Sequence, residues 1–139
     1  MMHTLAQLRT DLAADLAAQL PQANVYPYTH ASPSAPAVVI VPDDPYLEPA
    51  TIGGDPIRAR VRFRLVLLVA FGDSVAAQDR LDDLLVQVFA ALPSDCHVER
   101  CTSHGLTQVG PVEHLAADVQ VALMARLDVP APEPIPNGD

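Results

Sequence analysis

Alternating arginines mark one long strand of this chain. They stand at every second position of a run that continues into seven apolar residues, 65–71. The four are Arg58, Arg60, Arg62 and Arg64, and the positions between them hold Ala59, Val61 and Phe63. Because side chains of a strand point alternately to its two faces, the arginines share one face and the apolar side chains share the other. Residues 58–71 are therefore predicted to form a strand with one face in the core and one cationic face.

Two stretches have the spacing of amphipathic helices. Residues 4–20 place leucine at steps of three and four, and residues 75–92 repeat the pattern with leucine and valine. Thr4 is a suitable N-cap for the first helix, and Asp73 or Ser74 is suitable for the second. A proline follows each stretch and ends the helix. The sequence therefore predicts two helices that each bury one apolar stripe.

Three further segments are predicted to be strands. Residues 37–41 are continuously apolar and are closed by Pro42, which is typical of a strand buried on both faces. Residues 96–102 form a short strand that ends in a turn at Gly105. In residues 115–127 the odd positions are apolar and polar side chains stand between several of them, which indicates a second long strand.

These elements predict a single α+β domain over residues 1–127. It combines a mostly antiparallel sheet of about four strands with two helices packed on one face, so that the arginines lie on the opposite face. Residues 42–57 are rich in proline and acids and are predicted to form a projecting arm or hairpin between the first two strands. Residues 128–139 are rich in proline and are predicted to form a flexible tail.

Composition and charge exclude several classes of protein. A total of 17 acids against eight arginines gives a net charge of -9, whereas a general nucleic-acid binder usually carries a basic excess. The longest apolar run is far shorter than the roughly 20 residues that cross a bilayer. The sequence begins without a basic segment followed by an apolar block, so no signal peptide is expected. We therefore expect a protein of a reducing compartment with no membrane contact.

Cysteine and histidine gather in residues 96–104. This segment holds Cys96, His97, Cys101 and His104, and a soft metal would accept such ligands, but the spacing matches no recognised zinc motif. Adjacent residues of a strand also point to opposite faces, so two free thiols are the simpler interpretation. The sequence contains no nucleophile elbow, metalloprotease helix or glycine-rich phosphate loop. It therefore predicts neither an enzyme nor a cofactor.

The cationic face of the arginine strand has three interpretations. It faces solvent, it contacts nucleic-acid phosphates, or it pairs with carboxylates of the same or a neighbouring subunit. Acids outnumber arginines about two to one, which favours pairing between subunits. The candidate interface residues are Arg58, Arg60, Arg62, Arg64, Asp43, Asp44, Glu48 and Asp55.

The order of the elements and the residue types within them, over residues 3–127, match a known layout. The matching parts are the leucine helix, the extended Val25-Tyr26-Pro27-Tyr28, the strand at 37–41, the proline-rich Pro45-Tyr46-Leu47-Glu48-Pro49, the strand at 61–71, the helix at 75–92 and the final Leu115-Ala116-Ala117-Asp118-Val119-Gln120-Val121. In this layout the chain resembles the tail terminator proteins of long-tailed bacteriophages and the related tail-completion and neck proteins.

The resemblance implies a structural virion protein that forms a homo-hexameric ring on the finished tail tube. Such a ring stops polymerisation of the major tail tube protein and offers a docking surface to the head connector and neck proteins. Genomic DNA passes through the ring without specific binding. The protein would be assembled in the host cytoplasm and reside in the virion tail or neck. Two alternatives stay open: another head-closure or tail-completion protein of the neck, and a small metal-binding domain that uses residues 96–104.

Overall fold

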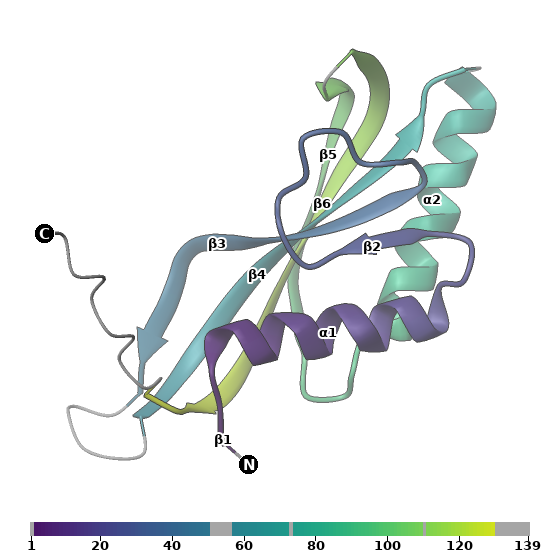
Figure 1. Ribbon diagram of the computed structural model, residues 1–139. Coiled ribbons are helices and arrows are strands. Elements are labelled where there is room, and N and C mark those ends of the chain that lie inside the picture. Colours follow the sequence, from purple (N-terminus) through teal and green to yellow (C-terminus); the bar gives the residue numbers. More distant parts are fainter. Residues whose placement is uncertain (1, 51–56, 73, 110, 130–139) are drawn as a thin grey trace, which may run out of the picture.

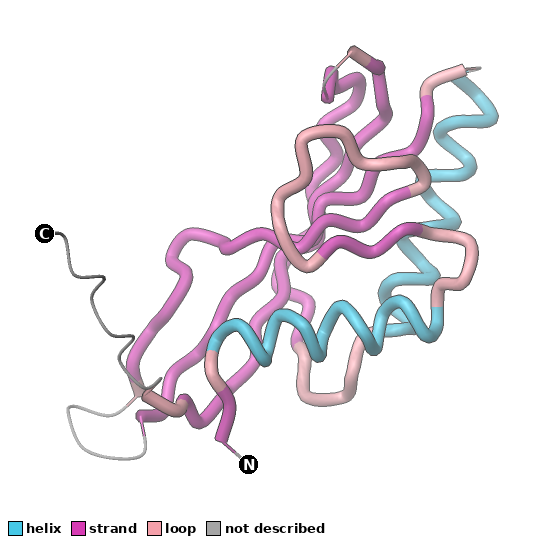
Figure 2. The backbone as a smooth tube through the Cα atoms, viewed as in Figure 1, coloured by secondary structure: helices cyan, strands magenta, loops and turns pink. Residues whose placement is uncertain are grey.

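The computed structural model describes residues 2–50, 57–72, 74–109 and 111–129 of the chain. These residues form two helices and six strands (Figure 1, Figure 2). In chain order the elements are β1 (Met2–His3), α1 (Leu5–Gln19), β2 (Asn24–Tyr26), β3 (Ala37–Pro49), β4 (Ile57–Ala70), α2 (Ser74–Ala91), β5 (His97–Val109) and β6 (Val112–Leu127).

All six strands belong to one mixed sheet with β4 and β6 at its centre. β4 and β6 pair antiparallel along the whole of β4, β3 pairs antiparallel with β4, and β5 pairs antiparallel with β6. The two shortest strands pair parallel, β1 with β6 and β2 with β3. The predicted α+β fold, with two helices and a mostly antiparallel sheet, is confirmed. The two short strands raise the number of strands above the four expected.

Both helices lie on one side of the sheet (Figure 1). α1 begins after Thr4, whose Oγ1 accepts a hydrogen bond from the backbone N–H of Gln7 at 3.2 Å. The backbone N–H of Thr4 donates in return to Oε1 of Gln7 at 2.9 Å. This capping box satisfies two backbone donors at the helix start and fixes where α1 begins. The N-cap predicted at Thr4 is therefore confirmed.

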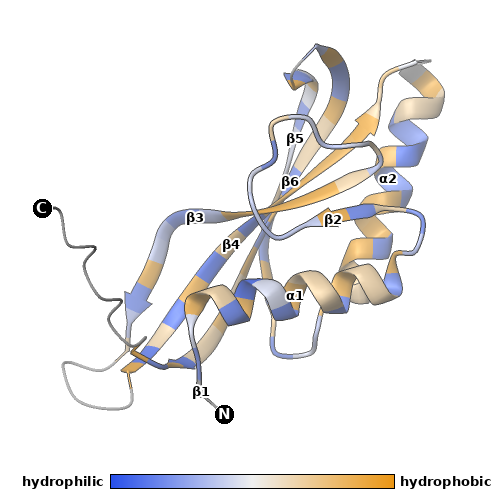
Figure 3. Ribbon diagram, in the orientation of Figure 1, coloured by the Kyte–Doolittle hydropathy of each residue, from blue (hydrophilic) through white to orange (hydrophobic). Residues whose placement is uncertain are grey.

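The core fills the space between the two helices and the apolar face of the sheet. Its buried members include Leu8, Leu12 and Leu16 of α1, Ala77, Leu81 and Val88 of α2, and Val61, Phe63, Leu65, Val119 and Val121 of the central strands. Figure 3 shows hydrophilic and hydrophobic residues alternating in the first part of β4 and hydrophobic residues in its later part, where it runs past α2. At this end Leu68 and Val69 are both buried, so the strand is covered on both faces.

β3 does not end at Pro42, as the sequence suggested, but continues to Pro49. The register with β4 shifts between Pro42 and Leu47, and pairing resumes until Pro49. β2 pairs only with the first three residues of β3. The later prolines therefore stand on an edge, where a missing N–H breaks no ladder bond. The first half of the predicted arm is thus strand, while residues 51–56, with Asp55, lie outside the described residues.

β5 runs through the turn that was predicted at Gly105. This glycine has a φ of 67°, which is a left-handed conformation that costs glycine little. The register with β6 shifts between Ser103 and Gly105, so the strand bulges here and continues to Val109. The predicted turn is therefore wrong. Residues 130–139 of the predicted tail lie outside the described residues.

Replacing Leu81 with alanine should lower the free energy of unfolding by about 2–5 kcal/mol, because Leu81 is 1% exposed and its loss leaves a cavity. Val86 of the same helix is 66% exposed and serves as the control. Val86→Ala should change stability by less than about 0.5 kcal/mol. Urea denaturation followed by circular dichroism measures both values. Equal losses for the two variants would contradict the placement of α2 on the sheet.

Candidate functional site

The arginines of β4 lie on the sheet face opposite the helices. Ala59, Val61 and Phe63 are at most 1% exposed in the core, and the strand turns the residues between them to the other side. The burial of β4 alternates along the whole arginine run, as predicted. The four arginines differ, however, in the groups that surround them.

Arg62 is held by two carboxylates of its own chain. Its Nε lies 2.9 Å from Oε1 of Glu99 on β5, and its guanidinium also contacts the carboxylate of Glu48 on β3. Between Arg62 and β5 stands Ala122 of β6, which is small enough for the ion pair to cross over it. The Arg62 side chain is only 15% exposed. The interface candidates Arg62 and Glu48 are therefore engaged within the fold.

A second ion-pair group surrounds Asp118 of β6, which is 7% exposed. Nε of Arg64 lies 3.5 Å from Oδ2 of Asp118, and Nε2 of His104 lies 2.8 Å from the same oxygen. These partners come from β4 and β5, on either side of β6. Asp118 and His104 were not among the interface candidates from the sequence, because only the strand register shows that they face Arg64.

The far end of this face is different, and we call it the arginine patch: Arg58, Arg60 and Arg126. Arg58 and Arg126 are direct cross-strand partners, and Arg60 stands opposite Met124. All three arginines are exposed. No ion pair within the described part of the chain reaches Arg60 or Arg126. Like charges directly opposite each other repel, so the contact between Arg58 and Arg126 does not by itself stabilise the sheet.

Arg126 was missed by the sequence analysis, although its position carries a signal. It stands between two apolar residues at the end of the last long strand, at one of the polar positions of that strand.

Two of the acid candidates of residues 42–57 lie away from the arginine patch. Asp43 is half-buried and Asp44 is exposed, and both belong to β3.

The edge of β6 is open beside the arginine patch. β5 pairs with β6 only as far as Ala122, and β1 begins to pair at Arg126, so residues 123–125 have no described strand on that side. Two hollows of about 280 and 330 Å³ flank this gap, and both touch Asp95 and Met124. Arg60 lines one of them and Arg126 lines the other. Met124 is 55% exposed at their junction.

On the helix side of the gap lies a third hollow, of about 190 Å³, which we call the acidic hollow. Asp11 and Asp15 of α1 and Asp95 contribute carboxylates to it. The pKa of the neighbouring Cys96 thiol is raised to about 12, first by burial and then by the negative charges of Asp95 and Asp15. The only described ion pair of these acids joins Asp11 to Nδ1 of His3 at 3.8 Å.

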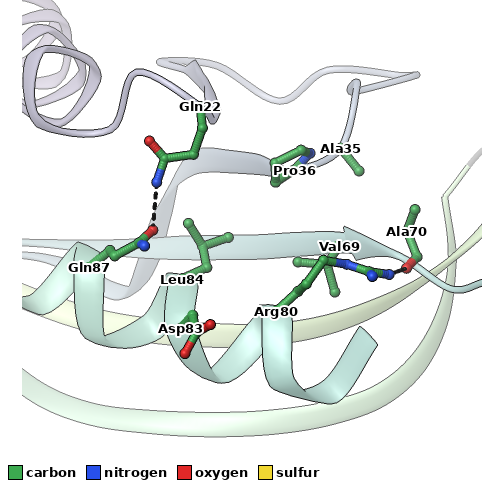
Figure 4. Close-up of a pocket in the computed structure, with 9 residues that line it drawn as sticks. All are labelled: Gln22, Ala35, Pro36, Val69, Ala70, Arg80, Asp83, Leu84 and Gln87. Atoms are coloured by element: carbon green, nitrogen blue, oxygen red, sulfur yellow. Dashed lines mark hydrogen bonds between the residues drawn. The ribbon is translucent and has the colours of Figure 1, made fainter. Parts of the chain in front are cut away.

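A separate cavity of about 310 Å³ lies between α2 and the end of β4 (Figure 4). Gln22 and Gln87 point toward each other and join in a hydrogen bond of 2.9 Å. Arg80 donates to the backbone carbonyl of Ala70 at 3.1 Å. The nine residues that line this cavity include no serine, cysteine or histidine. The lining therefore offers no nucleophile with an adjacent base.

The structure does not bring the cysteines and histidines of residues 96–104 together. Cys101 stands opposite Val119, on the helix side of the sheet, while His104 binds Asp118 on the other side. Cys96 lies before β5, and both thiols are free. Among the described residues, no group of three or more His, Cys, Asp or Glu side chains is arranged to hold a metal ion.

Comparison with models of protein families and with curated proteins finds no match to this chain. Neither of the helices in the described ranges has the length and apolar content to cross a membrane.

Two arginines of one strand face allow a matched test of these assignments. Arg62→Gln should lower the free energy of unfolding by roughly 1–3 kcal/mol, because Glu48 and Glu99 lose their shared partner. Arg60→Gln should change it by less than about 0.5 kcal/mol, since no described carboxylate depends on Arg60. Urea denaturation of both variants measures the difference. Equal stability of the two would show that the Arg62 ion pairs do not support the fold.

Proposed function

We propose that this protein is a structural virion protein of a long-tailed bacteriophage, a tail terminator that forms a hexameric ring on the tail tube. The described elements support the proposal because they follow the order on which the resemblance rests. α1 precedes β3 and β4, α2 follows them, and the long β6 comes last in chain order. In this role the protein performs no catalytic step and acts through its surfaces.

The observation that carries the proposal is the exposed arginine patch. Arg62 and Arg64 are paired with acids of their own chain, whereas Arg60 and Arg126 stand exposed with no ion pair in the described residues. A cluster of cations on a protein of net charge -9 is well suited to receive carboxylates of another copy. Association through such a surface provides the self-assembly that a ring requires.

The negative charge of the whole chain also supports a protein that surrounds DNA without binding it. Each copy carries a net charge of -9, so a ring of six presents a negative field. Such a field repels phosphate and lets DNA pass without being held. The other partners in this proposal are the tube protein on one side and the head connector or neck proteins on the other.

The test uses tail tube subunits of the same virus and electron microscopy. Added to growing tubes, the protein should stop elongation and appear at one end of each tube. Arg60→Glu should lose this capping because it disrupts the ring, while Arg100→Glu, an exposed change on β5, should retain it. Tubes that grow unchanged in the presence of the wild-type protein would refute the terminator role. Binding to purified head connectors but not to tubes would assign the protein to the neck instead.

A further inference from the structure

We propose that the arginine patch of one copy docks into the acidic hollow of the next, as a head-to-tail contact between subunits. This inference rests on the ring-forming part of the proposed function, and it names the two surfaces that meet. The occupant of the arginine patch is thus a second copy of this chain.

The two surfaces carry complementary charges. The patch offers Arg60 and Arg126 on an exposed strand face, beside the exposed Met124. The hollow offers the exposed carboxylates of Asp11 and Asp15 on α1. Guanidinium and carboxylate groups form charge-assisted and often bidentate hydrogen bonds, which are among the strongest polar contacts between proteins.

The shape of the acidic hollow also suits an arginine side chain. The acidic hollow is concave and has a volume of about 190 Å³, with apolar Leu8, Leu12 and Leu123 in its walls. An arginine side chain combines an apolar stem with a charged end, so it suits a site with apolar walls and acids. Met124 would supply an apolar contact beside the charged groups, in keeping with an interface that has an apolar centre and a polar rim.

The two surfaces lie on different sides of the sheet. The arginine patch lies on the sheet face away from the helices, whereas Asp11 and Asp15 belong to α1 on the helix side. A two-fold contact of the patch with itself would set arginine against arginine and is unfavourable. A head-to-tail contact joins unlike surfaces, and repeated copies then close into a ring when the rotation allows it.

Asp95 stands between the two surfaces within one copy. It lines the acidic hollow and also both hollows that contain Arg60 or Arg126, yet it forms no ion pair with either arginine in the described residues. Asp95 is exposed and therefore also remains available to a neighbouring copy, together with Asp11 and Asp15.

The experiment reverses the charges on each surface and follows assembly by sedimentation velocity. The patch variant is R60E/R126E and the hollow variant is D11R/D15R. Each variant alone should sediment as a monomer, because self-association should weaken by roughly a hundredfold or more. Mixed in equal amounts, they should form rings in which the two variants alternate, because the unchanged patch of one meets the unchanged hollow of the other and the two reversed surfaces also complement each other. The combined variant, with all four changes, should form rings again because both surfaces have exchanged charge.

The matched controls are R100E for the patch and D79R/D82R on α2 for the hollow, since all these residues are exposed and lie outside both surfaces. They should assemble like the wild-type chain. Circular dichroism should give the wild-type spectrum for every variant, and R60Q/R126Q provides a milder change if a reversal variant unfolds. Rings formed by the patch variant alone, or a combined variant that stays monomeric, would overturn the inference.

The same variants separate this inference from the proposed function. If the combined variant assembles but neither it nor the wild-type protein caps tail tubes, the contact is correct and the tail terminator role is wrong. If the wild-type protein caps tubes while the patch variant still forms rings, the terminator role holds and the contact lies elsewhere.

Discussion

The alternation of side chains along β4 determines the layout of the whole molecule. One face of this strand supplies Val61, Phe63 and Leu65 to the core, and these side chains need an apolar layer that α1 and α2 provide. The other face carries arginines, and a helix packed over them would have to bury charge, which is costly without partners. β6 pairs with β4 over the whole length of β4 and extends the same division. Two layers, a sheet face that is cationic at the arginine end, and the ion pairs between strands all follow from this one constraint.

Arginines of a single stripe serve two different purposes. Arg62 is largely covered and joins three strands through Glu48 and Glu99, so its charge is matched inside the chain. Arg60 lies two positions away on the same face and is exposed, and the carboxylate of its cross-strand partner Glu48 contacts Arg62. The difference follows from the neighbours, because Glu99 reaches Arg62 over the small Ala122 whereas Arg60 stands opposite the bulky Met124. The fold therefore pairs one part of the stripe with its own acids and leaves Arg60 exposed.

Local patterns predicted the elements well, and long-range pairing explains what they missed. Both helices and the two central strands were predicted because each has one buried face, which sets a period in the sequence. Pro42 suggested a strand end, but a proline on an edge costs no ladder bond and β3 continues past it. Gly105 suggested a turn, but a glycine also serves a bulge. The Asp118 ion pairs and the place of Arg126 depend on strand register, which no local pattern contains.

The most direct test of this account is the solution molar mass measured by light scattering at low and high salt. We predict a six-subunit ring of the 14.8 kDa chain at low salt. Exposed charge pairs are screened by salt, so the ring should dissociate toward the monomer near 1 M. A monomer under both conditions would contradict self-assembly through these surfaces. A hexamer whose mass does not change with salt would show that the arginine patch is not what joins the subunits.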